Sequence, residues 1–217
     1  MKTNKKTKYS LLFRLAKYPN STNRVPKYEE KTKMLEEMLY FEKKGLFRPP
    51  EETGSATNAD EEILKMNTAL FVDDIYLDRD TSDILKYNRK IFDVLFGMNE
   101  KFKESWFFNE VNINVDRTLV SYYEDSCYYK GHKDESVMTT VSWFFKEPKK
   151  FKGGDISFPD YDLTFEVSTD MVIIFPSNIV HSVSEISIDD NDKGKQFGRF
   201  CMSNFLYNNY VPPIIIE

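Results

Sequence analysis

The chain has 217 residues, 41% of them hydrophobic, which suits a single domain with one substantial core. Its two cysteines form neither a metal-binding spacing nor a disulfide framework, and no apolar run reaches transmembrane length. These features argue against a disulfide-stapled secreted domain and against a membrane span. The sequence predicts a soluble, intracellular and cytoplasmic protein, and it leaves the oligomeric state open.

Charge is distributed unevenly along the chain. The net charge is −5, but residues 1–50 hold 13 Lys and Arg against 5 Asp and Glu, a net of +8. Such a basic end could contact nucleic acid or an anionic membrane. We favour a simpler interpretation, in which residues 1–25 form an irregular polar segment and the next basic residues lie on the exposed face of a helix. The remaining chain, 26–217, is then one domain.

Two amphipathic helices are expected in the part 26–105. The first covers about 27–44, where apolar residues recur at helical spacing before Gly45, a plausible stop. A loop rich in proline and glycine follows over Leu46–Asp60. The second helix starts after the candidate caps at 80–82 and ends near Gly97.

Short β runs separated by turn residues dominate the part 106–210, after one earlier candidate strand at Thr68–Val72. This spacing is typical of a sandwich or barrel. Together with the helices it predicts an α+β, mainly β, fold in which the N-terminal helices pack on one sheet. The predicted strands are Trp106–Asn109, Thr118–Tyr123, Val137–Lys146, Ile156–Phe158, Leu163–Val167, Met171–Phe175, Ile179–Val183 and Gln196–Tyr207.

The only two histidines of the chain fall in a pattern that suggests a metal centre. His132 and Asp134 are two residues apart, so in an extended segment their side chains point to the same face. His181 lies in a later β run. Two histidines and one carboxylate form the facial triad of non-haem Fe(II) oxygenases. A His-x-Asp alone is equally common as a pair of surface residues, so the neighbouring motifs have to decide.

Further motifs follow in a fixed order. They are Thr139-Thr140-Val141-Ser142-Trp143-Phe144-Phe145, Gly153-Gly154-Asp155-Ile156-Ser157-Phe158-Pro159, Asp170-Met171-Val172-Ile173-Ile174-Phe175-Pro176-Ser177, His181-Ser182-Val183 and Gly198-Arg199-Phe200-Cys201-Met202-Ser203. In this order, over about Thr118 to Tyr207, the chain resembles the 2-oxoglutarate- and Fe(II)-dependent oxygenases, specifically their prolyl 4-hydroxylase-like branch. The first hundred residues match no motif of that family.

The resemblance implies a double-stranded β-helix, or jelly-roll, and a set of site residues. The iron ligands would be His132, Asp134 and His181. Arg199 would bind the distal carboxylate of 2-oxoglutarate, for which a planar guanidinium fork is suited. Ser203 would donate a second hydrogen bond, and Tyr123 would line the cosubstrate pocket. Tyr129 and Trp143 are candidate pocket residues, although simple aromatic packing also explains Tyr123 and Tyr129.

The implied reaction couples oxidative decarboxylation of 2-oxoglutarate, to succinate and CO2, with hydroxylation of a substrate C–H bond. The carboxylate ligand Asp134 favours hydroxylation over halogenation, because the related halogenases leave that position empty for halide. Ascorbate is a further candidate cofactor. The substrate is expected to be a prolyl or other residue of a peptide or protein, a free amino acid, or another small molecule.

Two alternatives to this reading concern the partner and the activity. Nucleic acid is disfavoured, because the demethylases of the superfamily carry a second arginine where this chain has Phe205, and because the β-rich part is acidic. The alternative of another class is a non-catalytic jelly-roll that binds a partner or serves a structural role.

The chain departs from the family pattern at three places. Ser126 stands where some members have glycine, and Phe144 stands where we align a tyrosine that holds the cosubstrate in some members. Arg199 follows His181 by 18 residues, a long interval, with an apparent polar insertion at 188–194.

Overall fold

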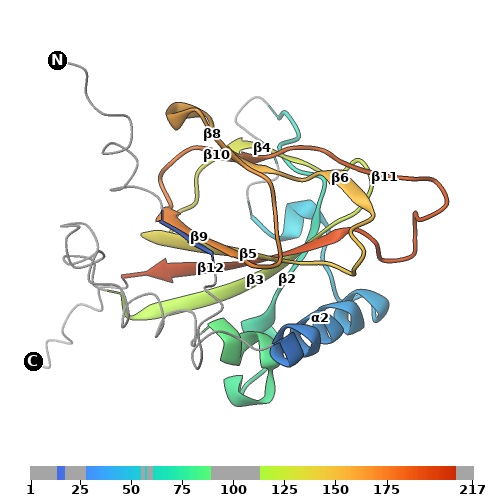
Figure 1. Cartoon of the computed structure of the whole chain (residues 1–217). Helices are drawn as coiled ribbons and strands as arrows, with labels where there is room; N and C mark the ends of the chain where they lie inside the picture. The colour runs from blue at the N-terminus through green and yellow to red at the C-terminus, as the bar shows by residue number, and fades with distance from the viewer. Residues whose placement is uncertain (1–13, 18–27, 55–56, 58–60, 89–112, 209–217) are drawn as a thin grey trace, which may run out of the picture.

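A computed structural model describes residues 14–17, 28–54, 57, 61–88 and 113–208 of the chain. Two antiparallel sheets face each other in it (Figure 1). The larger sheet has the order β1 (Arg14–Lys17), β9 (Met171–Pro176), β5 (Met138–Phe144), β12 (Arg199–Tyr207), β3 (Val115–Tyr123) and β2 (Thr68–Phe71). The smaller sheet has the order β4 (Tyr129–His132), β10 (His181–Val183), β7 (Ile156–Phe158) and β8 (Leu163–Phe165). A two-stranded sheet pairs β11 (Ile186–Ile188) with β6 (Phe151–Gly153).

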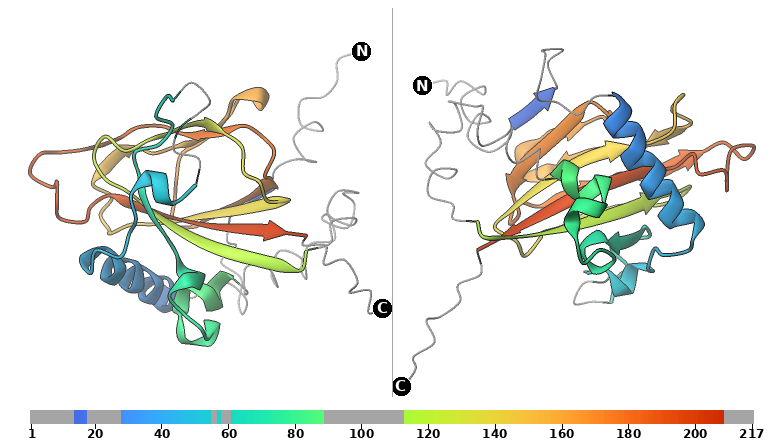
Figure 2. Two further views of the ribbon diagram at one scale, coloured as in Figure 1. Left: turned by 180° about the vertical axis from the view of Figure 1, so that it is seen from behind. Right: turned by 90° about the horizontal axis from the view of Figure 1, so that it is seen from below.

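Helix α2 (Tyr28–Lys43) lies across the outer face of the larger sheet (Figure 2). Its buried side chains Met34, Met38 and Phe41 recur at spacings of four and three, so they share one face of the helix. They belong to the same core as Val120 and other outward-facing side chains of the sheet. Burial of each such side chain contributes about 1.5–3 kcal/mol, which explains why a helix with a charged outer face docks here.

The end of α2 follows a local rule. Gly45 adopts a positive φ of 65°, and the amide of Leu46 donates a hydrogen bond to the carbonyl of Phe41. This six-residue closure is the Schellman motif, in which glycine accepts the left-handed conformation without a steric penalty. The predicted end of the helix at Gly45 is therefore confirmed.

The larger sheet has a separate core on each face. Along β5, Met138 and Phe144 face the core under α2, whereas Val141 and Trp143 face the space between the sheets. The alternation follows from the two-residue period of a strand. Phe144, which we aligned with a cosubstrate tyrosine, therefore points away from the interior of the jelly-roll, and that alignment was wrong.

The prediction of a mainly β jelly-roll with a helix packed on one sheet is confirmed. The predicted strands at 68–72, 118–123, 137–146, 156–158, 163–167, 171–175, 179–183 and 196–207 all correspond to strands, with boundaries shifted by a few residues. Residues 83–88 are helical, in agreement with the start of the second predicted helix. The remainder of that helix and the strand Trp106–Asn109 lie outside the described residues.

Three strands of the structure were not predicted from the sequence. Arg14–Lys17, expected to be irregular, forms the edge strand β1, whose register with β9 pairs Arg14 with Ile174. Phe151–Gly153 and Ile186–Ile188, for which the sequence analysis predicted no strand, pair as β6 and β11. Each of these strands is too short to produce a clear hydrophobic alternation, so its pairing partner decides its conformation.

The remaining described elements are single 3₁₀ turns: η1 (Pro50–Glu52), η2 (Val72–Asp74), η3 (Arg79–Thr81) and η4 (Pro159–Tyr161). Among the described residues, no helix is both long enough and apolar enough to cross a lipid bilayer.

Candidate active site

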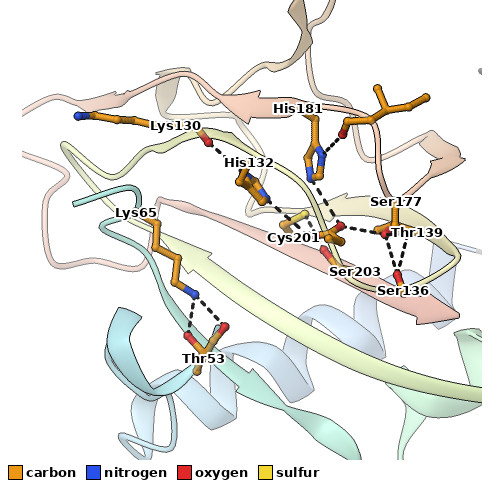
Figure 3. Close-up of polar contacts among 12 residues, drawn as sticks. Thr53, Lys65, Lys130, His132, Ser136, Thr139, Ser177, His181, Cys201 and Ser203 are labelled. Carbon is orange, nitrogen blue, oxygen red and sulfur yellow. Dashed lines mark hydrogen bonds and ion pairs between the residues drawn. The ribbon is translucent and has the colours of Figure 1, made fainter. Parts of the chain in front are cut away.

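The three predicted metal ligands meet at one end of the smaller sheet. His132 is the last residue of β4 and His181 the first of β10, and the two are direct partners in the antiparallel pairing of these strands. Asp134 follows β4 by two residues, and its amide donates a hydrogen bond to the carbonyl of Ser177. Its two carboxylate oxygens lie 3.7 Å from Nε2 of His132 and 3.6 Å from Nε2 of His181. Figure 3 shows both imidazoles converging on this point.

The backbone holds both imidazoles in the tautomer that a metal requires. Nδ1 of His132 lies 2.9 Å from the carbonyl oxygen of Lys130, and Nδ1 of His181 lies 3.0 Å from that of Ile179. A carbonyl oxygen only accepts, so each Nδ1 carries the proton. Each Nε2 therefore presents its lone pair towards Asp134, which is the usual arrangement of metal-binding histidines.

A buried chain of hydroxyl groups orients the carboxylate. Oγ1 of Thr139, on β5, donates a hydrogen bond of 2.9 Å to Asp134. The same hydroxyl lies 2.7 Å from that of Ser177, which lies 2.6 Å from that of Ser136. Thr139, Ser177 and Ser136 are all buried, so these groups depend on one another for hydrogen bonds. The network restricts the carboxylate to one orientation (Figure 3).

The environment favours the uncharged form of the His132 imidazole. Burial, and secondarily the charge of His181, lower the pKa of His132 to about 3. The ring of Tyr129 stacks on that of His132 with 3.4 Å between centroids and nearly parallel planes, which removes water from one face. Burial raises the pKa of Asp134, while the charge of His181 and the hydrogen bond from Thr139 oppose this rise. A buried carboxylate next to the uncharged imidazole of His132 has a strong tendency to take up a cation.

These residues fit a divalent metal. One ligand atom from each of His132, Asp134 and His181 can be chosen so that all three lie within 4.8 Å of one another. Ligands at adjacent octahedral positions around a metal, each about 2.1 Å from it, lie about 3.0 Å apart. The separations of 3.6 and 3.7 Å involve different oxygens of Asp134, so binding of a metal through one oxygen requires the three side chains to move closer together. Two nitrogens and one oxygen on a common side suit iron(II).

A cavity of about 320 Å³ opens between the sheets at the triad. The predicted pocket residues Tyr123, Tyr129, Trp143 and Ser203 all line it, together with the three metal ligands. Trp143 is buried and its indole N–H has no hydrogen-bond partner among the described residues. This N–H is available to a ligand in the cavity.

Arg199 is fully buried next to this cavity and does not itself line it. Its guanidinium lies over the ring of Tyr123, 4.4 Å from the centroid, a favourable cation–π contact. None of its three nitrogens donates a hydrogen bond to a described residue. The thiol of Cys201 lies beside it, and the guanidinium partly offsets the rise in the thiol pKa that burial causes. Burying a guanidinium without a partner is costly, so the site fits an anion.

Glycine at position 154 makes room for this guanidinium. A Cβ atom built on Gly154 would lie 2.8 Å from Nε of Arg199, and φ of Gly154 is +72°. A side chain here would meet both a steric clash and an unfavourable backbone conformation. The second glycine of the Gly153-Gly154 motif thus leaves the space that Arg199 occupies.

At position 126 the structure explains why glycine occurs in some members of the resembled family. Ser126 adopts a φ of +64°, and its amide donates a hydrogen bond of 2.7 Å to the carbonyl of Ile186. This left-handed conformation favours glycine, and serine adopts it at a modest energetic cost. The departure at Ser126 therefore leaves the turn intact.

Two polar residues of the cavity wall were missed by the sequence analysis. Lys65 and Asn67 are buried, at 2% and 1% exposure, and both line the cavity. They precede β2 and continue its inward-facing positions with a period of two, through Ala69 and Phe71. That alternation is a signal that could have identified them, but the segment carries no family motif.

The fold has counterparts among solved structures. A Pseudomonas putida prolyl-4-hydroxylase superposes with a TM-score of 0.61 at 11% sequence identity, covering 91% of this chain and 93% of that one. A truncated form of the collagen prolyl hydroxylase of Paramecium bursaria Chlorella virus-1 superposes with a TM-score of 0.52 at 12% identity, covering 91% and 90%. No family model and no curated protein matches the sequence. At these identities the likeness concerns the fold, and the chain has the jelly-roll of the prolyl hydroxylases.

Proposed function

We propose that the protein is a 2-oxoglutarate- and O2-dependent hydroxylase that acts on a C–H bond of an amino-acid side chain and forms succinate and CO2. The observation that carries this proposal is one combination of groups inside the jelly-roll. A converging His132–Asp134–His181 cluster lines the cavity, and the buried, unpaired guanidinium of Arg199 lies next to the cavity, over the ring of Tyr123. A metal site alone would suit many functions, whereas a metal site with a buried anion site suits a bidentate dicarboxylate cosubstrate.

In this proposal, His132, Asp134 and His181 hold iron(II) and leave the opposite positions open to ligands. Iron and 2-oxoglutarate would supply the one-electron and O2 chemistry. The protein's part is to hold the ligand set: the carbonyls of Lys130 and Ile179 orient the imidazoles, and Thr139 orients the carboxylate.

Arg199 is the group that would receive the distal carboxylate of 2-oxoglutarate. Its planar fork can donate two parallel hydrogen bonds, and it stays charged even when buried. Ser203, four residues after Arg199 on the same face of β12, lines the cavity and has a hydroxyl to donate. The ring of Tyr123 packs against the guanidinium in a cation–π contact. These roles explain why the chain keeps an otherwise unpaired buried charge.

The cavity walls would exclude water from the reaction. Val141 and Trp143 are almost fully buried, and Tyr129 covers one face of His132. In such a low-dielectric site, charge interactions are stronger and side reactions with solvent are suppressed. The presence of Asp134 as a third ligand supports hydroxylation as the outcome.

The substrate class is supported by fold likeness to two structures named as prolyl hydroxylases, one of them a collagen prolyl hydroxylase. We propose a prolyl or other residue of a peptide or protein, or a free amino acid, as the substrate. An oxygenase of another small molecule is the next candidate, and a non-catalytic jelly-roll is the alternative of another class.

The experiment is an assay of succinate formation from 2-oxoglutarate under air, with and without Fe(II), and with and without ascorbate. We expect Fe(II)-dependent succinate that a chelator abolishes. A parallel screen of free amino acids and proline-containing peptides would record a mass gain of one oxygen. Absence of both succinate formation and 2-oxoglutarate binding in the iron-loaded protein would favour the non-catalytic alternative.

A further inference from the structure

Lys65 is buried, although apolar side chains close to it in the sequence are exposed. In the extended segment before β2, Ile63 and Met66 are 53% and 47% exposed, whereas Lys65 is 2% exposed. Stability alone would favour the reverse, with the apolar side chains inside and the ammonium in water. An inverted pattern of this kind occurs where a site requires the polar group.

The backbone of the segment fixes the direction of the Lys65 side chain. The amide of Lys130 donates to the carbonyl of Leu64 at 2.7 Å, and the amide of Met66 donates to the carbonyl of Tyr128 at 3.1 Å. Lys65 is thereby paired with Tyr129 on the edge of β4. Because side chains alternate along an extended segment, this pairing directs Lys65 inwards and Met66 outwards.

The ammonium group of Lys65 lies on the cavity wall close to the metal ligands. Its Nζ is 5.5 Å from the ring centroid of Tyr129, and that ring stacks directly on His132. The ring of Tyr129 therefore lies between the ammonium group and His132 of the candidate metal centre. Figure 3 shows its side chain reaching towards Thr53.

Hydrogen bonding leaves the charge of Lys65 without a counterpart. Nζ donates to the carbonyl and to the hydroxyl of Thr53, at 2.8 and 3.0 Å. An ammonium group has three protons, so one donor remains. No described carboxylate forms a salt bridge with it. Asn67, two residues along, places a second unsatisfied group on the same wall, since its Oδ1 has no hydrogen-bond partner among the described residues.

The buried charges of the loaded site do not balance unless a further anion binds. In the loaded site of the proposed function, iron(II) and Arg199 carry three positive charges, and Asp134 and 2-oxoglutarate carry three negative ones. Lys65 is then left as an uncompensated buried cation. Lys133 and Glu135 also line the cavity, but both are exposed and of opposite sign. One further negative charge would complete the site.

We propose that Lys65 binds a carboxylate group of the primary substrate and thereby selects substrates that have a free α-carboxylate. This inference rests on the proposed function, because the cosubstrate has to account for Arg199. A cavity of about 320 Å³, at the small end of ligand sites, leaves space for the cosubstrate and one compact group. The carboxylate can belong to a free amino acid or to the C-terminus of a peptide, two sources that share this chemistry.

The test is a binding measurement that does not require turnover. Protein loaded with Mn(II) and 2-oxoglutarate under anaerobic conditions is titrated calorimetrically with free L-amino acids and with short peptides. Each probe is also used as its C-terminal amide, which has the same shape without the charge. We expect at least one carboxylate to bind and its amide to bind at least about tenfold more weakly. The kind of probe that binds identifies the source of the carboxylate.

The variant Lys65→Met should abolish this preference of acid over amide. Lys65→Gln, which keeps a donor for Thr53, should lose it as well. The control is Lys150→Met, because Lys150 is also a lysine but is exposed, is paired with Asp192 and does not line the cavity. The thermal midpoint distinguishes a purely structural role: if Lys65 only anchors Thr53, Lys65→Met should lower the midpoint without changing the acid-to-amide ratio.

Three results would overturn the inference. They are equal binding of acid and amide to the wild-type protein, an unchanged preference in Lys65→Met, and binding of 2-oxoglutarate without binding of any carboxylate probe. If the wild-type protein does not bind 2-oxoglutarate, that result counts against the proposed function. The failure of the proposed function and the failure of this inference can therefore be distinguished.

Discussion

The imidazole rings of His132 and His181 lie 4.2 Å apart between centroids, as direct partners in the pairing of β4 with β10. Residues far apart in sequence thus share one rung of a sheet, and the register of two short strands determines the metal site. A slip of one residue would direct one imidazole to the opposite face. The hydrogen bonds from each Nδ1 to a carbonyl within its own segment add a local constraint on the same geometry.

Each metal ligand should be essential. We expect His132→Ala, Asp134→Ala and His181→Ala to abolish stoichiometric Fe(II) binding and succinate formation, because two remaining ligands hold the metal too weakly. The fold should persist, as judged by circular dichroism. Asp160→Ala, which removes an exposed carboxylate on η4, is the control. A variant with full iron content and full turnover would remove its residue from the ligand set.

Arg199 should determine the affinity for 2-oxoglutarate. Arg199→Met should raise the dissociation constant by about tenfold or more, since hydrogen bonds to a charged group contribute about 1.5–3 kcal/mol. Arg199→Lys should have a smaller effect because it keeps the charge but loses the fork. Calorimetry on the Mn(II)-loaded protein measures both. Equal affinity in Arg199→Met and the wild-type protein would reject the assignment.

Thr139 should act as a positioning residue for Asp134. Thr139→Val removes the hydrogen bond to the carboxylate while preserving the shape, and we expect metal affinity to fall by about 10–100-fold. The matched control is Thr140→Val, because Thr140 is the next residue of β5, is also buried, and faces the opposite side of the strand. Metal titrations that give the same affinity for Thr139→Val and Thr140→Val would contradict a specific role.

Binding of an acidic substrate should depend on pH through Lys65. Burial lowers the pKa of Lys65 to about 8, and the charge of Asp134 opposes this shift. The charged form binds a carboxylate, so binding should be complete well below pH 8 and should weaken as pH rises through that value. A bound anion stabilises the charged form and shifts the fall to higher pH. Calorimetric titrations between pH 6.5 and 9.5 check this, with Lys65→Met expected to show no such fall.

Because β1 is part of the larger sheet, N-terminal truncation should lower the stability of the fold. The sequence predicted an irregular polar segment over residues 1–25, but Arg14–Lys17 pairs with Met171–Ile174 of β9. Deleting 1–25 should lower the free energy of unfolding by about 1–4 kcal/mol, from the loss of several backbone hydrogen bonds. Deleting only 1–13 retains β1 and serves as the control. Urea unfolding that shows no difference between the two truncations would indicate that β1 contributes nothing to stability.

Much of the architecture was predictable because it depends on short-range periodicity. Buried strands such as Met171–Pro176 are recognisable in the sequence as apolar runs. Helix α2 is recognisable by the helical spacing of Met34, Met38 and Phe41. The convergence of His132 and Asp134 was predictable for the same reason, since a spacing of two residues sets their relative direction within one extended segment, whereas the place of His181 beside them was expected from the family resemblance. The fold class followed from the order of these elements.

Long-range placement decided the rest. That Phe144 faces α2 rather than the cavity depends on the phase of β5 in its sheet, which a one-residue alignment error inverts. Lys65 became part of the site because its segment pairs with the edge of β4, and no local pattern distinguishes a buried lysine from an exposed one. Composition and spacing indicate which groups a chain can offer. Only the packing of distant segments decides which charges are removed from water, because burial is a property of the whole fold.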